Sequence, residues 1–501
     1  MMSDVGGVHG RGRSFPVAIA GLIAAATALG LHLQLVSNYF FLYDDYALIG
    51  QTADLNWLQI VDRSLFGFWR PLSFLLQSQL ELLLGWAHPW GYAAGSMALH
   101  AVTCVLVGRL ASQLGASFQA ALGAALIAWI SPYATEAMYW LSAQFDLWST
   151  CGMLISLCAG LQFVQTTERR MSLLAVMLFG SVIAMAGKEN GIVLPAYFLA
   201  LAAVLPIARQ PTRMRRIAWV AGMQVAVGGF YLWWRTRLLG FGGGAYGSFW
   251  DLVANANLTQ NLASYVVALL LPPLPEGESL PGLAAIAFVR IPFLLVCLPG
   301  LVVALFRTHA TIPCVGVIAC LLTSILPVVW FGVSPDDGSR FVYLPGIFFG
   351  VFMALAWDAA WTRAGDSRRV AAVAALAIVV LGGMTWSRLY QQQRWMIAFK
   401  LSREALTRMT SGLEEADRLG TRELFLRYVP DRLVHGPPVM KGYALQYVHN
   451  VPDDRIAGTS STALVSDGSC VEATAIVSQI GAEQNAMVID VGPSPGERIC
   501  F

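Results

Sequence analysis

Long apolar stretches without charge are the feature that most constrains the fold of this chain. Many windows of about 20 residues have the length and composition that an α-helix needs to cross a bilayer. Hydrophobic residues make up 56% of the 501 residues and charged residues 12%, about half of the ~25% typical of soluble proteins. The composition therefore argues against a soluble globular fold. We expect an all-α polytopic membrane protein.

We expect about eleven transmembrane helices. Their expected limits are 15–37, 91–110, 117–132, 145–165, 171–187, 190–207, 217–235, 284–305, 311–330, 341–361 and 369–386. The first apolar run continues to Val36, too long for a typical signal peptide, so we expect it to remain as a span. Arginines gather at alternate span ends, from Arg11 and Arg13 to Arg368 and Arg369. The positive-inside rule then places the N-terminus in the cytoplasm and the C-terminus outside, and we expect a bacterial inner membrane.

The chain is predicted to have two domains. Residues 1–386 form the multi-span membrane domain, and residues 387–501 form an extracytoplasmic C-terminal helix followed by a small α/β segment. Apolar residues recur at helical spacing from Gln391 to Leu419, and Gly420 is a suitable stop for this amphipathic helix. After it we expect strands over 423–429, 442–448 and 486–491.

Cysteine spacing and net charge limit the possible partners. The eight cysteines show no metal-ligand spacing, so no metal site is predicted from them. Cys470 and Cys500 lie in the polar tail, where an extracytoplasmic location would allow a disulfide between them. The net charge of +2 is too small to indicate nucleic-acid binding.

Polar clusters stand at the expected outer ends of the spans. Asp44 and Asp45 follow the first apolar run directly, and carboxylates at a membrane boundary are costly to dehydrate, so they often mark a site. The further candidates are Glu136 and Asp146 in the second outer loop, Lys188 and Glu189 between two apolar runs, Arg340 and Tyr343 before another span, and Arg70 at the start of a short apolar helix expected over Pro71–Leu84.

Each candidate also has a structural interpretation. Asp44 and Asp45 could be solvated loop residues that end a helix, and Asp146 could cap the fourth span. Lys188 and Glu189 could pair with each other, and Arg340 could extend to the interface. Glu136 could cap a loop or pair with an arginine, Arg70 could anchor its interfacial helix, and His100 is expected to form a hydrogen bond between helices.

The order of short motifs adds a family resemblance. These motifs are Asp44-Asp45, Arg70-Pro71-Leu72, Pro89-Trp90-Gly91-Tyr92 through Leu99-His100, Thr135-Glu136-Ala137 with Trp140 and Asp146, Lys188-Glu189 with Gly191, and Arg340 with Tyr343 and Pro345. Over roughly residues 15–400 the chain resembles the GT-C superfamily of membrane glycosyltransferases, and most of all the transmembrane O-mannosyltransferase branch with its bacterial relatives. It departs from that pattern at Ala143-Gln144, where Gly-Arg is common, and at Ser339, where Glu is common.

The resemblance implies a glycosyltransferase that uses a polyprenyl-phosphate-linked sugar and a protein or glycan acceptor outside the cytoplasm. A hexosyl or pentosyl group would move by one inverting displacement, without a cofactor. Asp45 or Asp44 would be the base, and Lys188 and Arg340 would bind the donor phosphate. Glu136, Asp146, Glu189, Tyr343 and Arg70 would be further substrate-binding residues. Two adjacent carboxylates could also hold a divalent ion, so metal dependence stays open.

The alternative function is a transporter or flippase of a lipid-linked sugar. Its intramembrane acids and lysine would then act as relay or substrate groups. The sequence shows no paired inverted repeat, and its charged clusters gather on one side rather than at mid-membrane. These two observations favour the transferase.

Overall fold

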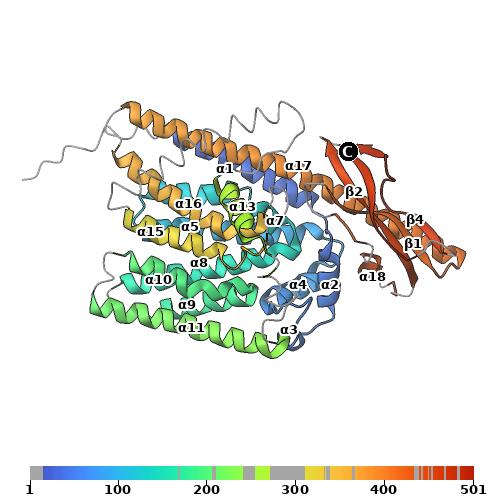
Figure 1. The fold of residues 1–501 in the computed structure, drawn as a ribbon, viewed down its shortest axis with the longest axis horizontal. Helices are drawn as coiled ribbons and strands as arrows, with labels where there is room; N and C mark the ends of the chain where they lie inside the picture. The colour runs from blue at the N-terminus through green and yellow to red at the C-terminus, as the bar shows by residue number, and fades with distance from the viewer. Residues whose placement is uncertain are drawn as a thin grey trace, which may run out of the picture.

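The computed structural model of the chain combines a bundle of helices with a small C-terminal sheet (Figure 1). It describes residues 15–166, 170–205, 210–240, 254, 256–270, 311–331, 333, 339–363, 367–433, 439–441, 444–449, 451–452, 455–467, 470–481 and 486–500. The bundle helices are α1 (Phe15–Asn38), α2 (Asp44–Ala53), α3 (Trp57–Val61), α4 (Pro71–Leu84), α5 (Pro89–Gln113), α6 (Phe118–Ile130), α7 (Ala134–Tyr139), η1 (Leu141–Ala143), α8 (Gln144–Gln165), α9 (Met171–Gly187), η2 (Glu189–Val193), α10 (Leu194–Ala203), α11 (Pro211–Leu239), α13 (Leu258–Leu270), α15 (Thr311–Ile325), α16 (Ser339–Arg363) and α17 (Ser367–Leu419).

Within the described residues, five helical segments are long and apolar enough to cross a membrane. They are Gly21–Asn38, Pro89–Gln113, Leu141–Gln165, Pro211–Leu239 and Ser339–Trp361. Four shorter apolar helices accompany them, at Phe118–Ile130, Met171–Gly187, Glu189–Ala203 and Ile312–Ile325. The expected all-α polytopic membrane fold is thus confirmed. The expected span at 284–305 lies outside the described residues, so the total of eleven stays a prediction.

Helices α8 and α9 pack closely at the centre of the bundle. A side chain at Gly180 would come within 2.6 Å of the backbone nitrogen of Ser156, so this approach depends on glycine. The hydroxyls of Ser156 and Ser181 lie 2.9 Å apart in the same interface. This tight packing fixes the start of α8 against the end of α9, where Asp146 and Lys188 stand.

The segment between α1 and α5 folds as three short helices at one end of the bundle, which we call the aspartate end (Figure 1). Helix α4 has the predicted limits, because Pro71 occupies its first turn and Gly85 follows it with a positive φ of 55°. Helix α2 begins with the two aspartates. The residue before them, Tyr43, has a positive φ of 45°, which is unusual for a side chain of this kind.

Helix α17 joins the bundle to the C-terminal sheet. It has 53 residues and passes through residue 386 without a break, so the expected last span and the amphipathic helix after it are one helix. It ends at Leu419 before Gly420, as predicted. Figure 1 shows it beside α1 and then extending to the sheet.

Arg388 of α17 is fully buried and ties three parts of the bundle together. Its guanidinium donates hydrogen bonds to the Ser131 carbonyl (3.1 Å) and to the Thr135 hydroxyl (2.6 Å). A third contact, of 3.0 Å, reaches Nδ1 of His32 in α1. The position of α17 is therefore set by polar contacts as well as by apolar packing.

The sheet has five strands in the order β4-β1-β2-β3-β5. The strands are β1 (Leu424–Leu433), β2 (Ile456–Asp467), β3 (Cys470–Gly481), β4 (Met487–Asp490) and β5 (Arg498–Cys500). β1 runs parallel to β2 and β4, whereas β3 runs antiparallel to its neighbours β2 and β5. β1 and β4 confirm two predicted strands. The strand predicted over 442–448 is wrong, because Ala444–His449 forms helix α18, with Ala444 and Leu445 buried.

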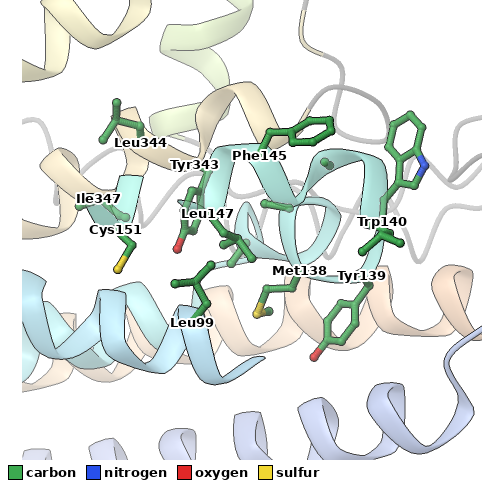
Figure 2. Close-up of a cluster of buried hydrophobic side chains, with 14 of the residues drawn as sticks. Leu99, Met138, Tyr139, Trp140, Phe145, Leu147, Cys151, Tyr343, Leu344 and Ile347 are labelled. Carbon is green, nitrogen blue, oxygen red and sulfur yellow. The ribbon is translucent and has the colours of Figure 1, made fainter. Parts of the chain in front are cut away.

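An apolar cluster lies where α5, α7, α8 and α16 meet. Figure 2 shows Leu99, Met138, Leu147 and Tyr343 meeting from α5, α7, α8 and α16. Tyr139 points away from them toward α1, where its hydroxyl lies 2.5 Å from Nδ1 of His32. This core supports the polar residues described next.

Candidate active site

Asp45 is fully buried at the start of α2 and accepts four hydrogen bonds. Oδ1 accepts from the backbone N–H of Ser142 (2.9 Å) and from its hydroxyl (3.1 Å). Oδ2 accepts from the backbone N–H of Leu42 (3.0 Å) and from the Tyr39 hydroxyl (3.3 Å). Both carboxylate oxygens are thus engaged, and they connect α2 to the turn that leads into α8.

Burial raises the pKa of Asp45 to about 7, and the nearby charge of Asp44 acts in the same direction. The hydrogen bonds from Leu42 and Ser142 lower this pKa but do not outweigh burial. Burial, followed by the charge of Asp45, also raises the pKa of Tyr39 well above its ordinary value. Tyr39 is therefore a neutral hydrogen-bond donor.

Asp44 faces a different environment. Its side chain is 49% exposed, and its Oδ1 lies 4.0 Å from Nζ of Lys441, which stands between β1 and α18. The two adjacent aspartates thus point to different surroundings, one enclosed by donors and one open to solvent. Asp44 is the one that a substrate could reach.

Lys188 and Asp146 form a buried ion pair. Nζ of Lys188 lies 2.6 and 2.7 Å from the two carboxylate oxygens of Asp146, and the side chains are only 7% and 10% exposed. Asp146 stands in the first turn of α8 but makes no N-cap, since Ala143 occupies that position. The cap interpretation of Asp146 is therefore wrong, and its ion pair with Lys188 was not predicted from the sequence.

Arg70 and Glu189 form a second pair, with two parallel hydrogen bonds. Nε and Nη2 of Arg70 donate to the Glu189 carboxylate over 3.0 and 2.7 Å. Arg70 is nearly buried, whereas the Glu189 side chain is 35% exposed. Lys188 and Glu189, adjacent in sequence, therefore pair with distant partners rather than with each other.

Glu136 and Arg340 form the third pair. Nη1 of Arg340 lies 3.4 Å from Oε1 of Glu136. Oε2 of Glu136 accepts from the Ser339 hydroxyl (3.0 Å) and from the Arg340 backbone N–H (3.1 Å) at the start of α16. A carboxylate at a helix N-terminus gains from the helix dipole. Ser339, a departure from the family pattern, takes part in this arrangement.

An aromatic ring connects two of the pairs, and charge connects all three. The Arg340 guanidinium lies 4.5 Å from the ring centroid of Trp140 and 5.0 Å from that of Phe341. Nζ of Lys188 lies 5.2 Å from Phe341, and the charges of Arg70, Glu189 and Arg340 all act on this ammonium. We call these three pairs the ion-pair cluster. Its three cations and three carboxylates balance in charge.

Helix α2, which begins with the two aspartates, adjoins the ion-pair cluster through a short turn. Ser142, which binds Asp45, lies in the chain between Trp140 and Asp146 of the cluster. The structure therefore brings the predicted residues Asp44, Asp45, Glu136, Asp146, Lys188, Glu189, Arg70 and Arg340 to one end of the bundle.

Tyr343 lies apart from the cluster, although it was predicted with it. Its hydroxyl lies 2.8 Å from Nδ1 of His100, and the ring belongs to the apolar cluster of Figure 2. This contact confirms the expected helix-to-helix role of His100.

The sequence did not point to three further residues. Ser142 carries no signal, because a serine in a loop is commonplace. Arg388 could have been noticed as a charge directly after an expected span. Lys441 stands in the tail, and no sequence pattern links it to Asp44. Within the described part of the chain, no group of three His, Cys, Asp or Glu residues is placed to hold a metal ion.

Comparisons with known proteins give distant structural similarities. No family model and no curated protein matches the chain. The archaeal oligosaccharyltransferase AglB from Archaeoglobus fulgidus, in complex with an inhibitory peptide and a dolichol-phosphate, aligns with a TM-score of 0.49 and 12% identity, over 89% of this chain and 69% of that one.

ArnT from Cupriavidus metallidurans is a second similar structure. In the apo state it aligns with a TM-score of 0.47 and 14% identity, over 89% of this chain and 92% of that one. Bound to undecaprenyl phosphate it aligns with a TM-score of 0.46 and 14% identity, over 94% and 99%. Because these TM-scores stay below 0.5, the function proposed below rests on the side chains of this chain.

Proposed function

We propose that the chain is an integral-membrane glycosyltransferase that moves a sugar from a polyprenyl-phosphate donor to an acceptor outside the cytoplasm. The observation that carries this proposal is the ion-pair cluster beside α2. Three cations at the edge of an apolar bundle suit a phosphate whose lipid tail lies in the membrane. A half-exposed carboxylate stands on the adjoining helix.

The reaction we propose is a single displacement. The acceptor hydroxyl oxygen forms a bond to the anomeric carbon while the bond from that carbon to the phosphate oxygen breaks. The phosphate leaves with the bonding electrons as polyprenyl phosphate, and the hydroxyl proton passes to a carboxylate. The anomeric configuration is inverted. A phosphate leaves as a stable anion, so it needs cations nearby rather than a general acid.

The roles follow from exposure and from hydrogen bonding. Asp44 is the base in this proposal, because its carboxylate is half exposed, whereas that of Asp45 is enclosed by four donors. Asp45 then positions α2 through Ser142. Lys188 and Arg340 bind the phosphate, and their partners Asp146 and Glu136 hold them in place when no donor is bound.

The test is transfer from a panel of radiolabelled polyprenyl-phosphate sugars in membranes that hold the wild type, Asp44→Asn, Asp45→Asn or Asp54→Asn. Asp54 is an exposed aspartate at the other end of α2 and serves as the matched control. We expect Asp44→Asn to lose about 10²- to 10⁴-fold in rate, as for removal of a general base. Asp54→Asn should match the wild type.

Two results would contradict the proposal. Equal transfer by Asp44→Asn and the wild type would remove Asp44 as the base. Movement of a lipid-linked sugar across the bilayer, with no transfer from any donor, would favour the transporter alternative.

A further inference from the structure

The C-terminal domain contacts the residue that precedes the two aspartates. The backbone N–H of Tyr43 donates a hydrogen bond to the Val439 carbonyl over 3.1 Å. Nζ of Lys441 lies 4.0 Å from the centroid of the Tyr43 ring. The same ammonium lies 4.0 Å from Oδ1 of Asp44. One short segment, Val439–Lys441, thus contacts the backbone, the ring and the carboxylate at the start of α2.

The Tyr43 backbone needs such support. Its φ of 45° and ψ of −108° are unfavourable for a residue with a large side chain, and a conformation of this kind costs about 1–3 kcal/mol. Tyr43 is the N-cap residue of α2, yet it makes no side-chain cap. The hydrogen bond to Val439 and the contact with Lys441 are interactions from outside the helix that hold this turn.

Other parts of the C-terminal domain fix the remainder of α2. The side-chain amide of Gln51 donates to the Tyr447 hydroxyl over 3.1 Å. Gly50 faces the Tyr447 ring so closely that no side chain would fit there. One turn before Gly50, the hydroxyls of Tyr46 and of Ser402 in α17 lie 2.9 Å apart. Helix α18 therefore lies against α2, as Figure 1 also shows.

We propose that the C-terminal domain completes the active site, with Lys441 as the positioning residue for Asp44. This proposal rests on the proposed function, since it takes Asp44 as the base. The ammonium lies 4.0 Å from both the Tyr43 ring centroid and Oδ1 of Asp44 and holds that carboxylate on the solvent side of α2, while Asp45 is buried. The domain is then part of the catalytic machinery.

The test compares Lys441→Ala, Lys441→Arg and Lys400→Ala in the full chain. Lys400 is an exposed lysine on α17 and provides a matched loss of charge. We expect Lys441→Ala to lower kcat about ten-fold, because a displaced catalytic group costs rate. The KM for the donor should change by less than about two-fold, because the phosphate site is untouched. Lys441→Arg should recover most of the rate, and Lys400→Ala should keep all of it.

Two further measurements separate positioning from a general loss of folding. In an Asp44→Glu background, where the carboxylate sits elsewhere, Lys441→Ala should cost much less than in the wild type. Amide hydrogen exchange at residues 44–47 should be faster in Lys441→Ala than in Lys400→Ala, with the rest of the bundle unchanged. Should Lys441→Ala fail to fold, Tyr43→Gly takes its place, because glycine accepts the positive φ and removes the side chain that Lys441 contacts.

The inference is overturned if Lys441→Ala resembles Lys400→Ala in both kcat and hydrogen exchange. It is also overturned if the loss in kcat is the same in the Asp44→Glu background. A wild type that transfers no sugar from any donor would instead contradict the proposed function, and hydrogen exchange alone would then decide whether Lys441 positions α2.

Discussion

Replacement of Asp146 by Asn should destabilise the protein strongly, because it leaves the Lys188 ammonium buried without a carboxylate. The two side chains are 7% and 10% exposed, so water cannot replace the lost partner. Loss of one member of a buried ion pair costs about 3–5 kcal/mol. The Asn side-chain oxygen can still accept one of the two hydrogen bonds that Lys188 makes now, which places the expected loss near the lower limit.

The pair Arg70–Glu189 provides an internal control. Arg70, the cation that Glu189→Gln leaves behind, is as buried as Lys188, at 6% against 7% exposed, but the Glu189 side chain is 35% exposed where that of Asp146 is 10% exposed. Glu189→Gln should therefore cost less than Asp146→Asn, because water reaches the replaced side chain and can bind the guanidinium from that side. The difference between the two substitutions measures the exposure of the replaced carboxylate, since both convert a carboxylate to an amide.

A double variant separates stability from activity. Asp146→Leu combined with Lys188→Met removes both charges, and an apolar replacement of a buried pair is often neutral for stability. We expect the unfolding midpoint to return close to that of the wild type. Sugar transfer should stay lost, because the cation proposed to bind the donor phosphate is gone.

Unfolding can be followed in detergent micelles with a thiol-reactive dye, since Cys104, Cys151 and Cys158 are free and buried in the folded protein. Transfer is measured on the same preparations. An Asp146→Asn variant that unfolds at the wild-type midpoint would refute the importance of burial for this pair. A double variant that regains transfer would refute the role of Lys188.

Three further predictions concern pH, metal and the C-terminal sheet. Burial raises the pKa of Asp45 from 3.8 to about 7, so the stability that this group contributes is present below pH 3.8 and is lost as the pH rises through 7. Between pH 5 and 8 the unfolding midpoint, followed by tryptophan fluorescence, should therefore fall more in the wild type than in Asp45→Asn. Equal slopes of the midpoint against pH would contradict this prediction. Dialysis against EDTA should leave sugar transfer unchanged, because the proposed displacement needs cations that the protein itself supplies; a loss that Mg²⁺ or Mn²⁺ restores would count against this mechanism. Cys470 and Cys500 are register partners in antiparallel strands. Facing Cα atoms in such strands are about 4.5–5.5 Å apart, a separation that suits a disulfide bond. Mass spectrometry after alkylation without reductant should find both cysteines unlabelled, whereas labelling of both would exclude the disulfide.

The sequence predicted best those features that depend on local signals. Helix α4 was correct at both ends, because Pro71 and Gly85 are local start and stop signals. The strand expected over 442–448 was wrong, because a short apolar run has no period long enough to separate a strand from a helix. Strands β2 and β3 were not predicted, since serine, threonine and glycine interrupt their apolar pattern.

Pairing between distant residues was less predictable. The charged positions were recognised as candidates because charge is rare in this chain, but their partners depend on how the helices pack. Lys188 pairs with Asp146 and not with its neighbour Glu189. The contact between Lys441 and Asp44 joins residues nearly four hundred positions apart in the chain, and only the folded structure brings them together.

The unbroken course of α17 makes it a lever. Its 53 residues correspond to a rod about 80 Å long, of which roughly 50 Å lies beyond residue 386. Arg388 hydrogen-bonds this helix to α1 and to the turn before α7, so we expect α17 to pivot at this residue. A tilt of only 5° at that point would move the far end by about 4 Å, by simple geometry on that length. Forces on the sheet would therefore be transmitted through α17 to α1 and to the turn before α7.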